Sequence, residues 1–262
     1  MIHDLIPLEW PEHHLAIGIR LHEAIVQNTV EFARALIVPS QAVSSSVTRE
    51  LRKHGRIDVP THVELLPVPS EFLGSAVEAR DLQDANYFII CGTIDSYKNH
   101  MLLLKIWPEL VTRIGVPAPK LVIAGSAGVT SKEVIDWIDS SASLHNHVIL
   151  APGLSTPSLR RLMAGARALL MPSFAEGFGL PIVEALAQGT PVIASDIPAH
   201  HEAGAGADVT YVSPTDGAGW LFQIEKLAKM PKERCVQSQP YKPKTWTDYF
   251  RGIEAFLAAL PK

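Results

Sequence analysis

The sequence lacks most features of a secreted, membrane-spanning or metal-rich protein. Its two cysteines, Cys91 and Cys235, are too few for a disulfide framework, so a reducing cytoplasm is expected. No run approaches the roughly 18 uncharged apolar residues that a membrane-spanning helix needs. Asp4, Pro7 and Glu9 interrupt the N-terminus in a way that argues against a signal peptide. Any membrane contact is therefore expected to be peripheral, at the inner face.

Several catalytic signatures and any excess of positive charge are also missing. The 23 Lys and Arg residues against 27 Asp and Glu give a net charge of -4, so nucleic acid is not an expected partner. The sequence has no D-x-D, no G-x-G-x-x-G and no G-x-S-x-G motif. The pairs His13–His14 and His200–His201 lack metal-ligand spacing and are expected on the surface. We therefore predict neither a metal site nor a cofactor.

The 262 residues are 47% apolar, and from residue 86 onward their pattern predicts an α/β fold. Short apolar runs suit strands buried in a parallel sheet, and they alternate with amphipathic stretches that suit helices. In such a sheet, ligands bind beyond the carboxyl ends of the strands. The predicted strands are 87–91, 121–124, 148–150, 168–171, 191–194 and 209–212, and the predicted helices are 99–113, 131–142, 158–166 and 181–188.

The first third shows a shorter version of the same pattern. Helices are predicted at 12–32 and 40–54, and strands at 35–38 and 63–66. The Pro-, Ser- and charge-rich stretch that follows is typical of a linker. The predicted division is a partial N-terminal domain at 1–66, a linker at 67–86, a ligand-binding domain at 87–230 and a C-terminal tail with a helix at 231–262.

The segment SFAEGFGLPIVE, residues 173–184, carries the most chemical information. It follows a predicted strand and opens a helix that has Pro181 in its first turn. Free N–H groups of Ile182 and Val183, together with the helix dipole, would favour a phosphate there. Gly177 and Gly179 would let a ligand approach the backbone closely. Carboxylates such as Glu176 and Glu184 are good acceptors for vicinal hydroxyls of a sugar or ribose.

The run EGFGLPIVEALAQGTPVIASDIPAHHE resembles the E-x7-E region of the retaining group 1 (family 4) glycosyltransferases, which have the two-domain GT-B fold. Further segments resemble the family in order and spacing, among them CGTIDSYKNHMLLLKIW, LVIAG, PGLSTPSLRRLMAGARALLMPSF, YVSPTDG and KTWTDYF. The resemblance implies a doubly wound donor-binding domain joined to a partial Rossmann-like N-terminal domain.

The resemblance also implies roles for particular residues. Glu176 would hold the donor sugar hydroxyls with the backbone of residues 177–179, and Glu184 would take the ribose hydroxyls. Lys98 would neutralise the leaving diphosphate, a role that stabilises charge developing in the transition state. His3 matches the family's active-site histidine. The implied set is His3, Gly92, Thr93, Lys98, Leu154, Glu176, Gly177, Phe178, Gly179, Leu180, Pro181, Ile182, Val183 and Glu184.

The implied activity is metal-independent transfer of a sugar, with retention, from a nucleotide diphosphate sugar to a glycan or lipid-linked acceptor in polysaccharide or lipopolysaccharide assembly. The chain departs from the family where Thr93 or Tyr97 stands in place of an arginine, and in beginning almost on the segment of His3. An alternative is therefore a truncated, silent donor-binding module, or half of a split enzyme whose residues 1–66 associate with a partner chain or a second copy. A sugar-nucleotide epimerase is less favoured, because the E-x7-E string is typical of transferases.

Overall fold

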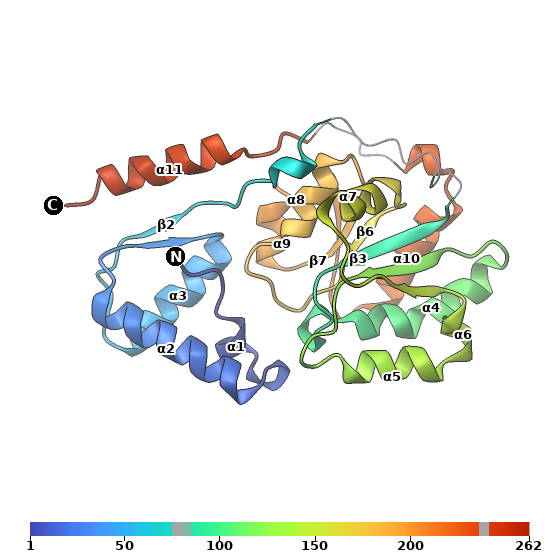
Figure 1. Ribbon diagram of the computed structural model, residues 1–262, viewed down its shortest axis with the longest axis horizontal. Helices are drawn as coiled ribbons and strands as arrows, with labels where there is room; N and C mark the ends of the chain where they lie inside the picture. Colours follow the sequence, from blue (N-terminus) through green and yellow to red (C-terminus); the bar gives the residue numbers. More distant parts are fainter. Residues whose placement is uncertain (75–81, 83–84, 236–240, 262) are drawn as a thin grey trace.

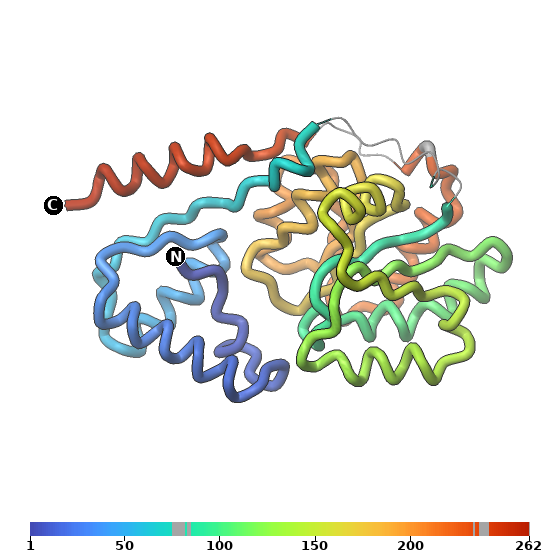
Figure 2. The backbone as a smooth tube through the Cα atoms, viewed as in Figure 1, coloured from blue at the N-terminus to red at the C-terminus, as the bar shows by residue number. Residues whose placement is uncertain are grey.

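The computed structural model describes residues 1–74, 82, 85–235 and 241–261, and it contains two parallel sheets (Figures 1 and 2). The smaller sheet pairs β1 (Leu36–Val38) with β2 (Thr61–Val63). The larger sheet has the strand order β5-β4-β3-β6-β7-β8. Its strands are β3 (Tyr87–Cys91), β4 (Lys120–Ala124), β5 (Val148–Leu150), β6 (Leu169–Met171), β7 (Val192–Ser195) and β8 (Val209–Val212). The predicted α/β fold with parallel strands is confirmed.

Helices cover both faces of the larger sheet, as the alternation of apolar runs and amphipathic stretches predicts. One face carries α4 (His100–Ile114), α5 (Lys132–Ser140), α6 (Ala142–His145) and α10 (Gly217–Lys229). The other carries α7 (Thr156–Gly165), α8 (Leu180–Ala187) and α9 (Pro198–Ala203). The first third contains α1 (Ile6–Glu9), α2 (Ala16–Phe32) and α3 (Gln41–Lys53). Short 3₁₀ turns lie at Pro11–His13, Ser70–Phe72, Ser96–Lys98 and Lys232–Arg234.

The core of the larger sheet is two layers, because successive strand residues point to opposite faces. Phe88 and Ile90 of β3 pack with Trp107 of α4, while Ile89 and Cys91 lie in the layer of α8. All five residues of β3 are buried, as expected for a central parallel strand. This rigid centre positions the loops that leave its carboxyl edge.

Several details differ from the sequence-based expectations. Helix α1 was not predicted, and the predicted helix 12–32 begins at Ala16, after a 3₁₀ turn at Pro11–His13. β2 spans Thr61–Val63 instead of 63–66, because the chain after Glu64 enters a stretch with Pro67 and Pro69, which lack the N–H that a ladder needs. The predicted helix 131–142 is broken into α5 and α6 at Ser141, whose backbone is extended. Helices α9 and α10 were not predicted. Gly217 and Gly219 lie in the first turn of α10, where glycine is unfavourable and weakens the helical pattern in the sequence. The helix is capped by the Asp216 carboxylate, which accepts a hydrogen bond from the Gly219 N–H at 2.9 Å.

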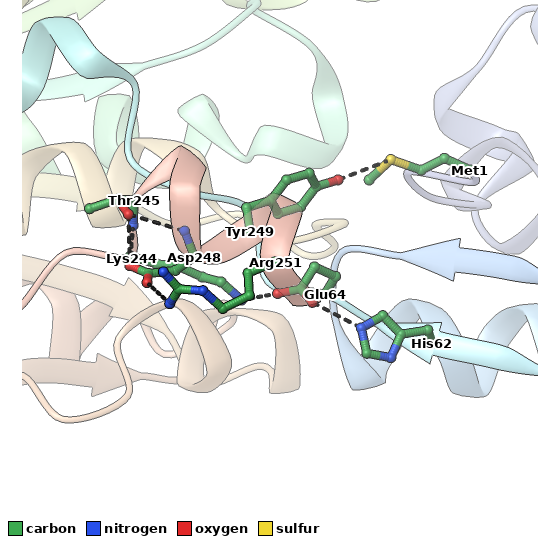
Figure 3. A network of polar contacts seen from close by, with 8 residues as sticks. All are labelled: Met1, His62, Glu64, Lys244, Thr245, Asp248, Tyr249 and Arg251. Carbon is green, nitrogen blue, oxygen red and sulfur yellow. Dashed lines mark hydrogen bonds and ion pairs between the residues drawn. The ribbon is translucent and has the colours of Figure 1, made fainter. Parts of the chain in front are cut away.

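The C-terminal helix α11 (Trp246–Ala258) returns to the first third of the chain and lies along β2 (Figure 1). The Phe256 ring stacks on His62 with 4.8 Å between centroids. Glu64 accepts hydrogen bonds from Lys244 and, at 2.9 Å, His62, while Thr245 and Asp248 form a capping box at the start of the helix (Figure 3). The predicted division at 67–86 and 231 stays a prediction, and residues 75–81, 83, 84, 236–240 and 262 of those segments lie outside the described residues.

Candidate functional site

The strand order locates the site before any side chain is considered. From β3 the chain proceeds outward to β4 and β5, then returns to place β6 on the opposite side of β3. Ligands of open α/β sheets bind at such a switch point, outside the carboxyl ends of the two strands. The loop after β3 carries Lys98, and the loop after β6 carries Glu176. Two candidate residues 78 positions apart are therefore brought together.

Lys98 and Glu176 form a buried ion pair. The Lys98 Nζ donates to Glu176 Oε1 at 2.6 Å and to Oε2 at 2.8 Å, and the Ser173 hydroxyl donates to Oε1 at 2.8 Å. Only 14% of the Lys98 side chain and 9% of the Glu176 side chain are exposed. Hydrogen bonds between ionised groups are stronger than neutral ones, so this pair fixes a cation and an anion at the switch point.

The loop that carries Lys98 is held in place by its neighbour, Asn99. Asn99 adopts a left-handed backbone, and its amide donates to the carbonyls of Pro172 at 3.0 Å and Pro214 at 2.9 Å. The Tyr97 carbonyl also accepts from the Phe174 N–H at 2.8 Å. These contacts tie together the loops after β3, β6 and β8. The sequence contained Asn99 in its KN segment but gave it no role.

A cavity of about 260 Å³ lies beside the ion pair. Its walls come from both parts of the chain, so the site lies in the cleft between the two sheets. The lining residues named in the sequence analysis are His3, Lys98, Glu176, Gly177, Phe178, Gly179, Leu180 and Pro181. Most of the implied donor-binding set is thus gathered around one space.

The start of α8 points its backbone into this region. Gly179 is the N-cap, with φ of +110°, and Pro181 is the second helical residue. The expectation for the Ile182 N–H was wrong, because this group donates to the Gly179 carbonyl at 2.9 Å. Within the described chain, the N–H groups of Gly179, Leu180 and Val183 donate no hydrogen bond, so these three, which include the expected Val183 N–H, are the donors available to an anion.

Gly177 has a neighbour that its sequence context did not predict. A Cβ at this position would lie 2.4 Å from the carbonyl oxygen of His3 and 3.2 Å from the Asp4 Cβ. The close approach at Gly177 is thus made by the N-terminal segment of the same chain. That segment is anchored by the Ile2 N–H, which donates to the Ile37 carbonyl at 3.1 Å, and it leaves the His3 side chain exposed at the cleft.

Glu184 lies one turn into α8, close to Cys91 at the end of β3. Burial raises the pKa of the Glu184 carboxyl to about 7, and desolvation is its single cause. Burial, with a smaller contribution from the Glu184 carboxylate, raises the pKa of the Cys91 thiol. A half-buried carboxyl that titrates near neutrality is typical of a functional site.

Six residues of the implied set are outside the described lining of the cavity, namely Gly92, Thr93, Leu154, Ile182, Val183 and Glu184. Gly92 has a φ of +125°, and a Cβ there would lie 3.8 Å from the Lys98 Cε, so it borders the ion pair. Thr93 is exposed in the same loop. Leu154 lies in the loop after β5, the edge strand, and is absent from the described lining of the cavity.

Ser40 and Glu202 join α3 to the glycine loop and to α9, and sequence reasoning gave neither residue a role in the site. The Ser40 hydroxyl caps α3 and donates to the Gly177 carbonyl at 2.6 Å. Glu202 accepts from the N–H groups of Gln41 at 2.6 Å and Ala42 at 2.9 Å. A carboxylate at a helix N-terminus also interacts favourably with the helix dipole. The available signals were the predicted cap at Ser40 and the position of Glu202 at the end of the resembling run.

Of the two histidine pairs, His201 is exposed as the sequence-based expectation had it, whereas His13 and His14 are half-buried and His200 is buried. His13 bonds the Ser96 hydroxyl at 2.7 Å, and the His14 ring stacks on Tyr97 with 5.4 Å between centroids. His200 is fully buried, with its Nδ1 3.0 Å from the Ser195 carbonyl. Among the described residues no group of three or more His, Cys, Asp or Glu side chains could hold a metal ion.

Across the described segments, no helix combines the length and apolar character needed to cross a membrane.

The family model "Glycosyl transferases group 1" matches residues 77–236. The O-antigen chain mannosyltransferase RfbU of Salmonella typhimurium is 25% identical over 234 residues, which cover 88% of this chain and 60% of RfbU. The serotype-specific mannosyltransferase WbdA of Escherichia coli is 28% identical over 284 residues, covering 100% of this chain and 33% of WbdA. The chain thus spans between a third and three fifths of the length of these two relatives.

Among solved structures, Anabaena Alr3699/HepE in complex with UDP aligns with a TM-score of 0.68 at 21% identity, over 99% of this chain and 71% of that protein. This likeness supports the GT-B type of fold. The family match covers more than half of the chain and includes the loops of Lys98 and Glu176. The chain therefore belongs to the glycosyl transferases group 1 family.

Proposed function

We propose that this chain binds a nucleotide diphosphate sugar in the cleft beside Lys98 and Glu176 and transfers its sugar, with retention, to a hydroxyl acceptor. A mannose-like hexose and a role in O-antigen or related polysaccharide assembly are supported by the names of the relatives RfbU and WbdA. A uridine diphosphate donor is supported instead by the HepE complex. Because these two lines of support differ, the base of the donor nucleotide has to be found by comparing guanosine and uridine nucleotide sugars.

The observation that carries this proposal is the Lys98–Glu176 ion pair at the switch point, next to the N–H groups that open α8. A diphosphate needs fixed positive charge, which Lys98 and the helix terminus supply. Sugar hydroxyls need acceptors, which the Glu176 carboxylate supplies. Glu184 is proposed to accept hydrogen bonds from the ribose hydroxyls.

The proposed reaction breaks the bond between the anomeric carbon and the diphosphate oxygen. The diphosphate leaves with both bonding electrons, and the Lys98 ammonium stabilises its growing charge. A phosphate oxygen accepts the proton of the acceptor hydroxyl, whose oxygen forms the new bond to the anomeric carbon on the same face. In this scheme the donor diphosphate competes with Glu176 for the Lys98 ammonium.

The test is binding of GDP-mannose and UDP-glucose by calorimetry to the wild type, Lys98→Ala and Glu184→Ala. Loss of a charge-assisted hydrogen bond of about 1.5–3 kcal/mol predicts roughly 10- to 100-fold weaker binding in each variant. Lys132→Ala is the control, because Lys132 is exposed on α5 and pairs with Asp136. Equal affinity in the wild type and Lys98→Ala would overturn the diphosphate assignment.

A second candidate function is a donor-binding module that acts only in association with another protein surface. It is favoured by α2, on which Ile17, Leu21 and Phe32 are each more than half exposed, together with Leu15 just before the helix. Exposed apolar side chains that share a helix face are typical of interaction surfaces. Glycosyl transfer by a monodisperse monomer in analytical ultracentrifugation would contradict this alternative.

A further inference from the structure

The turn that follows α1 carries three rings to the loops of the larger sheet. Two backbone hydrogen bonds close this turn, from the His13 N–H to the Trp10 carbonyl at 3.0 Å and from the His14 N–H to the Pro11 carbonyl at 3.1 Å. Pro11 restricts the backbone where the turn begins. Trp10, His13 and His14, which we call the ring clasp, are each half-buried, and the proposed reaction uses none of them.

The ring clasp holds the loop after β6 through Phe174. The Trp10 ring stacks on Phe174 with 6.1 Å between centroids and 22° between planes, and the His13 ring stacks on the same residue at 6.2 Å and 21°. Ring pairs at such separations attract one another beyond the area that they bury. Phe174 lies two residues before Glu176, so the clasp fixes the start of the segment that carries this carboxylate.

The ring clasp also holds the loop after β3. His13 Nδ1 lies 2.7 Å from the Ser96 hydroxyl oxygen, and the His14 ring stacks on Tyr97 with 5.4 Å between centroids. The Lys98 Nζ lies 5.3 Å from the centroid of the same Tyr97 ring, which is a cation–π contact. The Tyr97 ring therefore contacts both the clasp and the ammonium of the site.

A displacement of Lys98 and Glu176 should cost more in sugar transfer than in donor binding. The other proposed contacts of the donor, the glycine loop and the start of α8, belong to the larger sheet. Transfer also needs the Lys98 ammonium at the leaving oxygen while the acceptor meets the anomeric carbon. Small displacements of positioned groups lower reaction rates strongly, because the geometry is then wrong in the transition state.

We propose that the ring clasp is a positioning device for sugar transfer, which holds Lys98 and Glu176 in place relative to the first third of the chain. This inference rests on the proposed function, because it assigns the donor diphosphate to Lys98. The three rings act through Tyr97 and Phe174 and do not touch the reacting atoms. Loss of the clasp therefore lowers kcat, while most of the sugar-nucleotide affinity is kept.

The first experiment measures how firmly the clasp holds Lys98 and needs no substrate. Limited acetylation followed by peptide mass spectrometry compares Lys98, which is 14% exposed, with Lys132, which is 84% exposed. We expect the labelling of Lys98 relative to Lys132 to rise at least threefold in His14→Ala. It should return nearly to the wild-type level in His14→Phe, whose ring can stack on Tyr97. Equal labelling in the wild type and His14→Ala would overturn the proposal.

The second experiment measures transfer to methyl α-mannoside from GDP-mannose and UDP-glucose, with donor affinity determined alongside. We expect kcat to fall at least tenfold in His14→Ala and to recover in His14→Phe, while the donor Kd changes less than threefold. His201→Ala is the matched control, because it removes a histidine that stacks on another tyrosine, Tyr211, at 3.9 Å between centroids. An affinity that falls as much as kcat, or no recovery in His14→Phe, would overturn the positioning role.

These readouts separate the two claims. Increased labelling of Lys98 in His14→Ala, with no sugar-nucleotide binding and no transfer by the wild type, would contradict the proposed function and leave the hold on Lys98 standing. Donor binding that depends on Lys98, with labelling and kcat unchanged in His14→Ala, would contradict the clasp alone. A thermal melt of each variant identifies any effect that comes from unfolding.

Discussion

The burial of the Glu184 carboxyl bears on the ribose contact proposed for it. Its carboxyl has a pKa of about 7, above its ordinary value, because burial penalises the charged form. The stability contributed by the neutral form is fully present below the unfolded pKa and is lost as pH rises through about 7. A ligand that donates hydroxyls to the carboxylate would favour the charged form.

Sugar-nucleotide affinity should therefore rise with pH. Between pH 6 and pH 8 the ionised fraction of Glu184 rises roughly tenfold, so the proposed ribose contact predicts about tenfold tighter binding at pH 8. Glu184→Gln should flatten this dependence, whereas Glu109→Gln, at an exposed carboxyl of α4, should not. The measurement is calorimetric affinity at three pH values. A flat profile in the wild type would contradict the role of Glu184.

The sequence identified the charged residues of the site but not which of them form contacts with one another. Lys98, Glu176 and Glu184 were singled out by motif and resemblance, and the structure brings Lys98 and Glu176 within 2.6 Å. The roles of Asn99 and Ser40 were missed because both act through hydrogen bonds to carbonyls far along the chain. No local pattern reveals such partners.

At the scale of elements, the glycine loop is a contact between two parts of the chain. Gly177 meets the His3 carbonyl, and the Ser40 hydroxyl at the start of α3 binds the Gly177 carbonyl. Glu202 of α9 completes the junction at the N-terminus of α3. The loop that is proposed to hold the donor is thus held by the residues of the opposite wall.

Gly177→Ala should disrupt this junction. The added methyl would lie 2.4 Å from the His3 carbonyl, so the N-terminal segment must shift, and we expect a loss of about 1–3 kcal/mol in the free energy of unfolding. Gly18→Ala is the matched control, because nothing lies within 4 Å of its added methyl and alanine favours a helix. Urea titration measures both. A Gly177→Ala variant as stable as the wild type would contradict the contact.

Strands with a continuous apolar run were predicted from the sequence, whereas helices that depend on tertiary packing were not. β3, β5 and β8 span the predicted residues, since continuous apolar runs read the same from sequence and structure. Helix α9 was missed because it is only six residues long, Pro198–Ala203, and α10 because Gly217 and Gly219 in its first turn weaken the helical pattern. Their formation depends on buried residues such as His200 and Trp220, which pack only once the sheet exists.

For the whole molecule, buried histidines predict sensitivity to acid. Burial lowers the pKa of His100 to about 4, with Lys98 adding to the effect and Asp95 opposing it. Burial also lowers the pKa of His14, His147 and His200. Because the unfolded chain binds these protons more readily, stability present above the unfolded pKa of about 6.5 is lost as pH falls.

His100→Leu should reduce that sensitivity. Between pH 7 and pH 5 the histidine accounts for about 2 kcal/mol of lost unfolding free energy, which leucine would remove. His145→Leu, at an exposed histidine, serves as the control. Urea titrations at both pH values measure the difference. An identical pH dependence in His100→Leu and the wild type would show that His100 is not the group responsible.

The sequence by itself determined the α/β class, the succession of the six strands after residue 86, and the family's motif residues. These follow from local periodicity and from residue type at fixed spacing. The tertiary structure alone decided that Lys98 pairs with Glu176, that Gly177 faces His3, and that Ser40 and Glu202 join α3 to the glycine loop and to α9. Such contacts depend on how the strands are ordered across the sheet and how α3 meets α9, and no single segment of the chain carries that information.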